Sequence, residues 1–456
     1  VAAGTVTLNA NRGVSINDVM TSGGTLTVDA DLDNGSGGTF TVASGKSVTV
    51  TGGFGITADN VDLVGTLSGT AASTITDSDN TGVGLGAATV VGGLELSGAE
   101  LENITVGATG LTIATGGNIT VNGVTAANSN NITGTVSLDT TSGAGVVSFT
   151  AAPSTFNALN VQSDQGVDIA VNITTDTGSL VVQGDADTTD DAGDDKIDFT
   201  GAITLQSATT LQLDADTGGI VGDSGLSLLS ANGIAINDNL TTNGATILDV
   251  TDNSGDVTIA AAKAINTTSN TLNLDSGDLD LTGGQTINTG SAKLTITEST
   301  GDGIGLGTAL GGTAMDIADA ELAQLTTGDL ELLSAGKITV NGVTAGNTGT
   351  ISGTTTLSST GEIEFSTAAS VFDNALSVSS DDLVDIDQDV SSATGNLSIN
   401  GDADTDSDSN DQITIATGVT LAAGGSLSLD ADSAVIVLSG SGDTVTIQTT
   451  GGTGNI

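Results

Sequence analysis

Hydrophobic residues recur at every second position in short runs along the whole chain. Two clear examples are the segments VDIAVNI at 167–173 and VDIDQDV at 384–390. In the first, the valines and isoleucines share one face, and Asp168 and Asn172 share the other. In the second, three aspartates alternate with the apolar positions. This period of two predicts short β-strands with one buried face, and clusters of Gly, Asn and Asp roughly every 7 to 12 residues predict turns between them.

A helical pattern is weak everywhere. The best candidate is DIADAELAQL at 316–325, but the corresponding earlier part of the chain contains VVGGLELSG, which does not have a helical pattern. We therefore expect an all-β chain.

The pattern also repeats over a long distance. The segment ITVNGVTA at 119–126 returns at 338–345, which is 219 positions later. GVGLG at 82–86 corresponds to GIGLG at 303–307, and LDAD at 213–216 returns at 429–432, so the offset stays close to 220. Such self-similarity predicts two copies of one unit. We place the copies at 1–220 and 221–456, with the second continuous with the first.

The kind of side chain indicates the architecture. A β-sandwich usually needs large core residues, but this chain has no Trp or Tyr and only seven Phe. Small aliphatic residues suit the narrow interior of a parallel β-solenoid, and Gly and Asn suit its tight corners. Two or three strands and their turns would give about 20 residues per coil, with strands about 4.8 Å apart.

The amino-acid composition limits the kinds of partner that the chain can bind. There are 55 acidic against 6 basic residues, a net charge of −49. Such a chain repels nucleic acid and anionic membrane surfaces, and divalent cations are its natural counter-ions. The absence of Cys removes disulfides and thiolate chemistry. We find no signal peptide and no run of 18 apolar residues, so we expect no membrane insertion. Because the chain starts at Val1, we expect a mature form or a segment of a longer polypeptide.

Two segments resemble a known family. GIAINDNLTTNGATIL, from Gly233, and GVSIND, from Gly13, resemble the rod of filamentous haemagglutinin-like adhesins. The residues that carry this likeness are Gly233, Ile234, Ile236, Asn237, Leu240, Thr241 and Gly244, with Gly13, Val14, Ile16, Asn17 and Gly24 in the first copy. The resemblance implies a right-handed parallel β-helix on a bacterial cell surface or outside the cell. Surface glycans are then candidate partners.

Two acidic segments are the strongest candidates for a metal site. They are GDADTTDDAGDDKID from Gly184 and GDADTDSDSND from Gly401. Several carboxylates in one loop form the hard-oxygen site that Ca²⁺ prefers. The alternative is a solvated acidic loop that keeps the protein soluble. The candidate ligands are Asp185, Asp187, Asp190, Asp191, Asp194 and Asp195 in the first segment, and Asp402, Asp404, Asp406, Asp408 and Asp411 in the second.

Carboxylates can also catalyse glycoside cleavage, and some polysaccharide-cleaving enzymes are parallel β-helices. The sequence disfavours this reading. It has no His for acid–base catalysis and no Trp or Tyr on which a sugar could stack, and its six basic residues are scattered. We therefore expect no enzyme and no catalytic residues.

The Phe pairs Phe149/Phe156 and Phe365/Phe372 are expected to fill the core. The first prediction of function is a non-enzymatic structural or adhesive β-solenoid that forms a fibre, stalk or sheath. Its partner would be itself, end to end or laterally, or neighbouring repeats of a longer chain. The alternatives are a calcium-dependent surface-layer or matrix protein and, less favoured, a polysaccharide-active enzyme.

Overall fold

The computed structural model describes residues 4–35, 37–186, 195–216, 218–252, 255–308, 315–404, 411–431, 435–439, 444–450 and 455. The structure is all-β, with 50% of residues in strands and 4% in helices. The chain separates into two compact units, Val1–Ser230 (unit 1) and Ala231–Ile456 (unit 2). The predicted fold class is confirmed at this level: the protein is built from long parallel sheets.

Within the described ranges, unit 1 contains five sets of hydrogen-bonded strands. The longest runs in the order β1 (Val6–Asn9), β4 (Leu26–Asp29), β7 (Phe54–Ala58), β10 (Ser73–Asp77), β14 (Leu111–Ala114), β16 (Thr135–Asp139), β19 (Ala158–Gln162), β22 (Leu180–Gln183) and β25 (Thr210–Asp214). The second runs β12 (Leu94–Ser97), β11 (Val83–Gly86), β15 (Ile119–Asn122), β17 (Val147–Phe149), β20 (Val167–Ile169), β23 (Ile197–Phe199) and β26 (Ile220–Gly222). The third runs β18 (Ser154–Phe156), β21 (Ile173–Thr175), β24 (Ile203–Ser207) and β27 (Leu226–Ser230). The last two are β13 (Ile104–Val106), β9 (Thr66–Gly69), β6 (Ser47–Val50) and β3 (Met20–Ser22), and β2 (Val14–Ile16), β5 (Thr39–Val42) and β8 (Asn60–Leu63).

Unit 2 is arranged in the same manner. Its longest set runs β30 (Thr246–Val250), β33 (Leu272–Ser276), β35 (Leu294–Glu298), β39 (Leu330–Ser334), β41 (Thr354–Ser359), β44 (Ala375–Ser380), β47 (Leu397–Asn400) and β50 (Leu427–Asp430). The second runs β37 (Met315–Ala318), β36 (Ile304–Gly307), β40 (Ile338–Asn341), β42 (Ile363–Phe365), β45 (Leu383–Ile386), β48 (Gln412–Ala416) and β51 (Val435–Ser439). The third runs β43 (Ser370–Phe372), β46 (Val390–Ser392), β49 (Thr420–Ala423) and β52 (Thr446–Thr449). The others are β29 (Leu240–Thr242), β32 (Ala264–Asn266), β34 (Thr286–Asn288) and β38 (Leu325–Thr326), and the pair β28 (Gly233–Ile236) and β31 (Asp256–Ile259).

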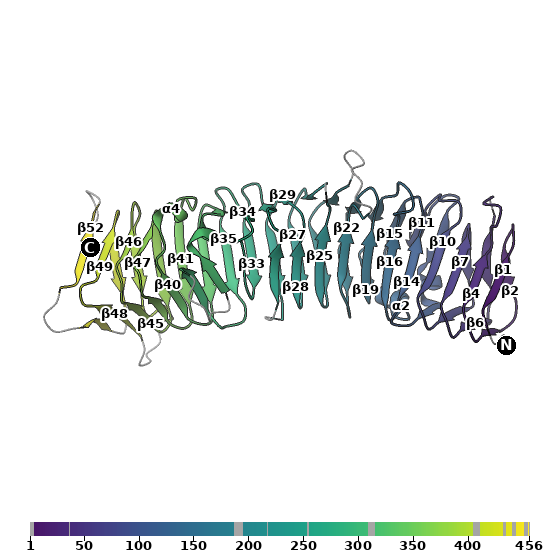
Figure 1. Cartoon of the computed structure of the whole chain (residues 1–456), viewed down its shortest axis with the longest axis horizontal. Helices are drawn as coiled ribbons and strands as arrows, with labels where there is room; N and C mark the ends of the chain where they lie inside the picture. Colours follow the sequence, from purple (N-terminus) through teal and green to yellow (C-terminus); the bar gives the residue numbers. More distant parts are fainter. Residues whose placement is uncertain are drawn as a thin grey trace. The chain divides into compact units, whose positions relative to one another are not determined.

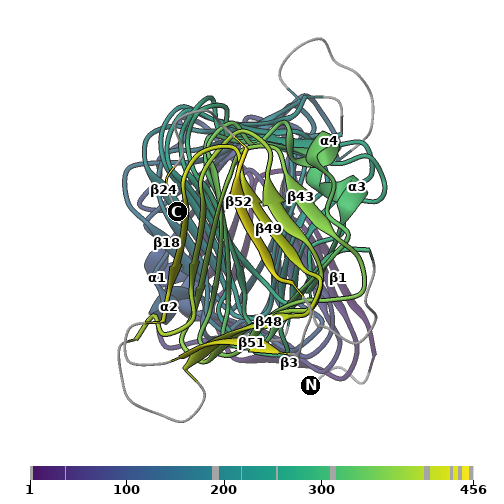
Figure 2. The same ribbon diagram turned by 90° about the vertical axis from the view of Figure 1, so that its left-hand side faces the viewer.

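Successive strands of the chain enter different sheets and then return. β16, β17 and β18 pair in parallel with β19, β20 and β21, each with the strand three places later. Figure 1 shows β14, β16, β19 and β22 of unit 1 side by side. Figure 2 shows β43, β49 and β52 of unit 2 as one layer and β48 and β51 as another. This connectivity is compatible with a β-solenoid.

The length of chain between paired residues varies. Ile56 pairs with Ile75, whereas Ser73 pairs with Leu111, which lies twice as far along the chain from its partner. The longer path holds β11, β12, β13 and the helix α1 (Gly98–Glu102). A uniform coil length therefore does not describe every step, because some connections carry extra elements.

The core consists of in-register columns of aliphatic side chains. In unit 1, one column passes through consecutive strands of the longest sheet and contains Leu111, Val136, Leu159, Leu180 and Leu211. All five side chains are buried. Burying one such side chain contributes about 1.5–3 kcal/mol, so stacking of like residues is the main source of stability. The Phe prediction is confirmed, since Phe149, Phe156, Phe365 and Phe372 are all buried.

The corners interrupt the alternation that the sequence shows. We expected Val171 to share the buried face of Val167, Ile169 and Ile173, but the chain turns between β20 and β21, and Val171 lies in that turn, half-buried. Glycine is required where two turns meet. Gly303 has φ +107°, and a Cβ there would lie 2.2 Å from the carbonyl oxygen of Lys337, a position that only glycine occupies without strain.

Four short helices lie between the strands of the described ranges: α1, α2 (Ala126–Ser129), α3 (Asp319–Leu322) and α4 (Ala345–Thr348). The expectation that 316–325 contains no helix is wrong for α3. The first-copy segment that argued against it, VVGGLELSG at 90–98, contains β12, and its last residue, Gly98, begins α1. Ser97 and Glu100 form a capping box, in which the Glu100 carboxylate accepts from the Ser97 amide at 2.8 Å. This local pair starts one helical turn without any longer periodicity.

Candidate functional site

The predicted acidic loop of unit 1 connects β22 to β23, and both of its ends are buried next to these strands. Asp185 follows β22 and Asp195 precedes β23 by two positions, and both carboxylates are buried. The ends of the loop meet, because a Cβ on Gly184 would lie 2.9 Å from the carbonyl carbon of Lys196. The Ala186 amide donates to the Ser163 carbonyl at 2.8 Å. The other predicted ligands here, Asp187, Asp190, Asp191 and Asp194, lie outside the described residues.

The loop of unit 2 has the same geometry at its ends. Asp402 and Asp411 are buried, and Asp404 is exposed. A Cβ on Gly401 would lie 2.7 Å from the Gln412 carbonyl oxygen, and the Ala403 amide donates to the Ser380 carbonyl at 2.9 Å. Asp406 and Asp408 lie outside the described residues.

Burial determines whether these aspartates can bind a cation. A carboxylate taken out of water is costly unless hydrogen bonds or a cation compensate it. Each loop therefore offers two buried carboxylates at its base, Asp185 with Asp195 and Asp402 with Asp411. Oxygen donors of this kind suit a hard cation such as Ca²⁺.

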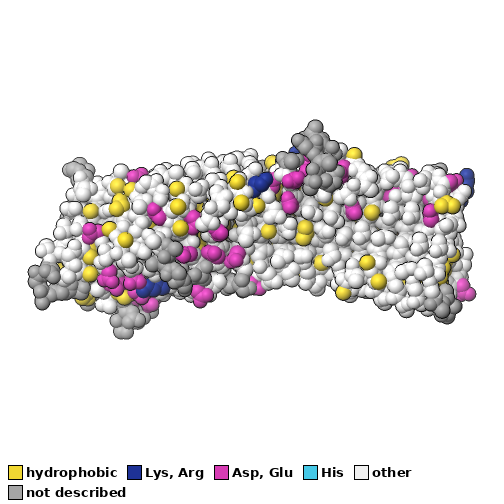
Figure 3. Space-filling model, in the orientation of Figure 1, with side chains coloured by type: hydrophobic (Ala, Val, Ile, Leu, Met, Phe, Trp, Pro, Cys, Tyr) yellow, Lys and Arg dark blue, Asp and Glu magenta, His cyan; other side chains and the backbone are white. Residues whose placement is uncertain are grey.

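A second acidic cluster was not among the sequence candidates. One carboxylate oxygen from each of Glu364, Asp385 and Asp387 lies within 4.8 Å of the others. Lys337 contacts this cluster, with its ammonium 2.8 Å from Glu364 and 3.1 Å from Glu362. Figure 3 shows acidic side chains gathered around basic ones over the part of unit 2 that holds β40 and β45. Sequence alone missed the cluster because the paired strands β42 and β45 are separated along the chain by two other strands, although the alternating aspartates at 385–389 were a visible signal.

The pKa values in this cluster follow from its crowding. Burial raises the pKa of Asp385, and the charges of Asp387, Glu362 and Glu364 raise it further. Burial alone would lower the pKa of Lys337, but hydrogen bonds to Glu364 and Glu362 outweigh it and raise that pKa. The cluster can hold a divalent cation or remain balanced in part by Lys337.

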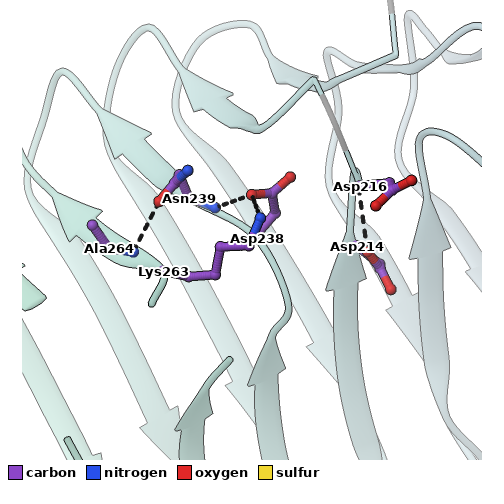
Figure 4. A network of polar contacts seen from close by, with 6 residues as sticks. All are labelled: Asp214, Asp216, Asp238, Asn239, Lys263 and Ala264. Carbon is purple, nitrogen blue, oxygen red and sulfur yellow. Dashed lines mark hydrogen bonds and ion pairs between the residues drawn. The ribbon is translucent and has the colours of Figure 1, made fainter. Parts of the chain in front are cut away.

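An ion pair recurs at corresponding corners of the two units. In unit 2, the Lys263 ammonium lies 2.6 Å from Asp238 Oδ1, and the same oxygen accepts from the Asn239 amide at 2.6 Å. The Asn239 side chain in turn accepts from the Ala264 amide at 3.0 Å (Figure 4). In unit 1, Lys46 contacts Asp18 at 3.3 Å, and Asp18 accepts from the Val19 amide. In each unit the pair joins two successive turns of the chain, so its role is structural.

Buried carboxylates also organise the turns that lead into β11 and β36. Glu298 accepts hydrogen bonds from the amides of Thr300, Gly301 and Gly303 and from the Ser334 hydroxyl. In unit 1, Asp77 accepts from the Gly82 amide at 2.9 Å and the Thr115 hydroxyl at 2.8 Å. Both carboxylates therefore fix a glycine turn against the next strand of the longest sheet.

Comparison with known proteins gives no relative. No family model, no curated protein and no solved structure matches the chain. In the described ranges, none of the helices has the length and apolar character needed to cross a membrane.

Proposed function

We propose that the chain is a non-enzymatic structural or adhesive β-solenoid of an extracellular fibre, stalk or sheath. In this proposal the sheets form a right-handed parallel β-helix with three strands per coil and two copies of one unit. The in-register aliphatic columns support it, because each coil then buries its core only against its neighbours. The resemblance of Gly13–Asp18 and Gly233–Asp238 to adhesin rods is in agreement.

The observation that carries the proposal is an exposed apolar pair on β51. Its residues Ile436 and Leu438 pair in register with Ile413 and Ile415 of β48. The β48 residues are fully buried, whereas Ile436 is 41% and Leu438 57% exposed. Side chains that continue a buried column yet remain exposed offer a hydrophobic surface along a strand edge. A further coil, from a second copy or from more of the same polypeptide, would cover them.

Substitution on the two faces of β51 tests this proposal. The variant Ile436→Ser/Leu438→Ser should abolish rods longer than one chain in electron micrographs and reduce the sedimenting mass. Val437 lies between them on the opposite face, in register with Thr414, so Val437→Ser is the matched control and should assemble normally. Assembly that survives the double substitution would contradict the proposal. A wild-type chain that stays monomeric at high concentration would rule out a second copy as the source of the covering coil.

A calcium-dependent surface-layer or matrix protein is the second candidate. The observation in its favour is the burial of Asp402 and Asp411 at the base of an acidic loop, and the same arrangement at Asp185 and Asp195. Cations bound by these carboxylates would couple calcium to folding.

A further inference from the structure

Unit 2 has a trough on the outer face of its longest sheet. A hollow of about 420 Å³ crosses β30, β33, β35 and β39, and is lined by Asp249, Asn273, Asp275, Thr295, Thr297 and Glu331, among others. A second hollow of about 410 Å³ shares Asp275 and Thr297 and extends to Ser358 on β41. The two hollows therefore form one trough that runs across five neighbouring strands.

The polar side chains of the trough lie in rows. Asp249, Asp275 and Thr297 are in-register partners on three consecutive strands. A parallel row contains Asn273, Thr295 and Glu331. Neighbouring strands lie about 4.8 Å apart, so the rows present regularly spaced carboxylate, amide and hydroxyl groups to an extended ligand.

The charge of the trough is concentrated at Asp249 and Asp275. Glu331 is neutralised by Lys293, whose ammonium lies 2.5 Å from its carboxylate. Glu298 is occupied by the hydrogen bonds of its own turn. Asp275 differs, because its Oδ1 is buried and accepts no hydrogen bond from the described residues. Burial and the neighbouring charges of Asp249 and Glu298 raise the pKa of Asp275, and they outweigh the nearby Ser299 hydroxyl, which lowers it. A ligand that brings a positive charge and hydrogen-bond donors would relieve this cost.

Unit 1 shows that the fold does not require the carboxylates of Asp275 and Glu331. The segments TITD at 74–77 and TITE at 295–298 lie on β10 and β35. Thr76 of β10 pairs with Thr57, and Thr297 of β35 pairs with Asp275. Thr57 of unit 1 therefore occupies the position that corresponds to Asp275 of unit 2. By the same register, Thr112 corresponds to Glu331. Since the sheet stacks with threonine at these two positions, the carboxylates of Asp275 and Glu331 are not needed for packing. Asp249 differs, because its counterpart Asp29, which pairs with Thr57, is also an aspartate.

We propose that the trough binds a segment of an amino-sugar polysaccharide, with an ammonium group at Asp249 and Asp275 and ring hydroxyls on the neighbouring Thr and Asn side chains. The volume exceeds what a bare cation fills, and the hydroxyl and amide lining matches a ligand with many hydroxyl groups. The choice of a glycan as the ligand rests on the proposed function at a cell surface. The shape and charge of the trough are independent of that proposed function.

Binding of a hexamer of β-1,4-linked glucosamine to the full chain, measured by calorimetry, tests this inference. Asp275→Thr installs the residue that unit 1 carries, so the variant should fold, and its affinity should fall about ten- to a hundredfold. Asp385→Asn removes one charge from the acidic cluster on another sheet and should leave binding unchanged. The fully N-acetylated hexamer, which lacks the ammonium groups, should bind at least about tenfold more weakly.

Three results would overturn the inference: equal binding by Asp275→Thr, equal binding of a lysine hexamer, or displacement of the sugar by millimolar Ca²⁺ alone. Electron micrographs of the same samples separate this outcome from the function proposed above. Asp275→Thr should assemble like wild type, so a loss of sugar binding with intact rods concerns the trough only.

Discussion

The Lys263 ammonium lies 2.6 Å from the Asp238 carboxylate, and the Asp238 side chain is only 3% exposed. The corresponding pair Lys46–Asp18 has the same arrangement, but its Asp18 side chain is 90% exposed. The two pairs join similar turns of the chain and differ mainly in their access to water.

This difference predicts unequal stability effects. Lys263→Met leaves a buried carboxylate without its cation, which should cost about 3–5 kcal/mol. Lys46→Met removes an exposed pair that water and salt screen, so it should change the stability much less. Urea unfolding of both variants measures the difference. Equal losses would mean that water reaches the Asp238 carboxylate in the folded protein.

The Glu298 turn predicts sensitivity to acid. Burial would raise the pKa of Glu298, but hydrogen bonds from Thr300, Ser334 and Gly303 outweigh it and lower that pKa. A group whose pKa is lower in the folded state stabilises the protein at pH values above its unfolded-state pKa, here about 4.3. This stabilisation is lost as the pH falls through the folded-state pKa. Glu298→Gln should therefore be less stable than wild type by about 1–3 kcal/mol at pH 7. This gap should shrink below about pH 4.

Asp77 is a control for which the pH dependence of stability should have the opposite sign. Burial raises its pKa although the Gly82 amide and Thr115 hydroxyl lower it in part. Its ionised form costs stability at neutral pH, and that cost disappears as the carboxyl is protonated. Wild type should therefore gain stability relative to Asp77→Asn as the pH falls. Parallel pH profiles for the Glu298 and Asp77 variants would refute the assignment of these turns.

Calcium removal tests the acidic loops. If the carboxylates at Asp402 and Asp411 bind Ca²⁺, excess chelator should lower the melting temperature, and Mg²⁺ should not fully restore it. Asp402→Asn/Asp411→Asn should respond less to chelator than wild type, because the loop with Asp185 and Asp195 is still present. An unchanged wild-type melting curve would leave these loops as solvated acidic segments with a buried base.

The solenoid arrangement predicts its own spectroscopic and diffraction signals. Circular dichroism should show β-structure with very little helix, and oriented samples should show a repeat of about 4.8 Å along the stacking direction. More than about a fifth of helix would contradict the parallel-sheet architecture.

Some features of the candidate sites were open to sequence reasoning and others were not. The acidic loops were visible because their aspartates are adjacent in the chain. The trough was not, since Asp249, Asp275 and Thr297 come from three strands that are well separated along the chain. In-register pairing of distant strands creates such rows, and a sequence contains no direct record of register.

The local alternation of apolar and polar residues determined the strands and their buried faces by itself. Val384 and Ile386 are buried and Asp387 is exposed, as the pattern VDIDQDV predicts. A strand exposes alternate side chains to opposite faces, so a period of two is sufficient to assign them. Only the tertiary structure decided where the chain turns and which carboxylates meet. Asp18 and Asp238 occupy similar sequence contexts, yet one is exposed and the other buried. The physical reason is that burial depends on the neighbouring turns that cover a side chain, and those turns are far away in the sequence.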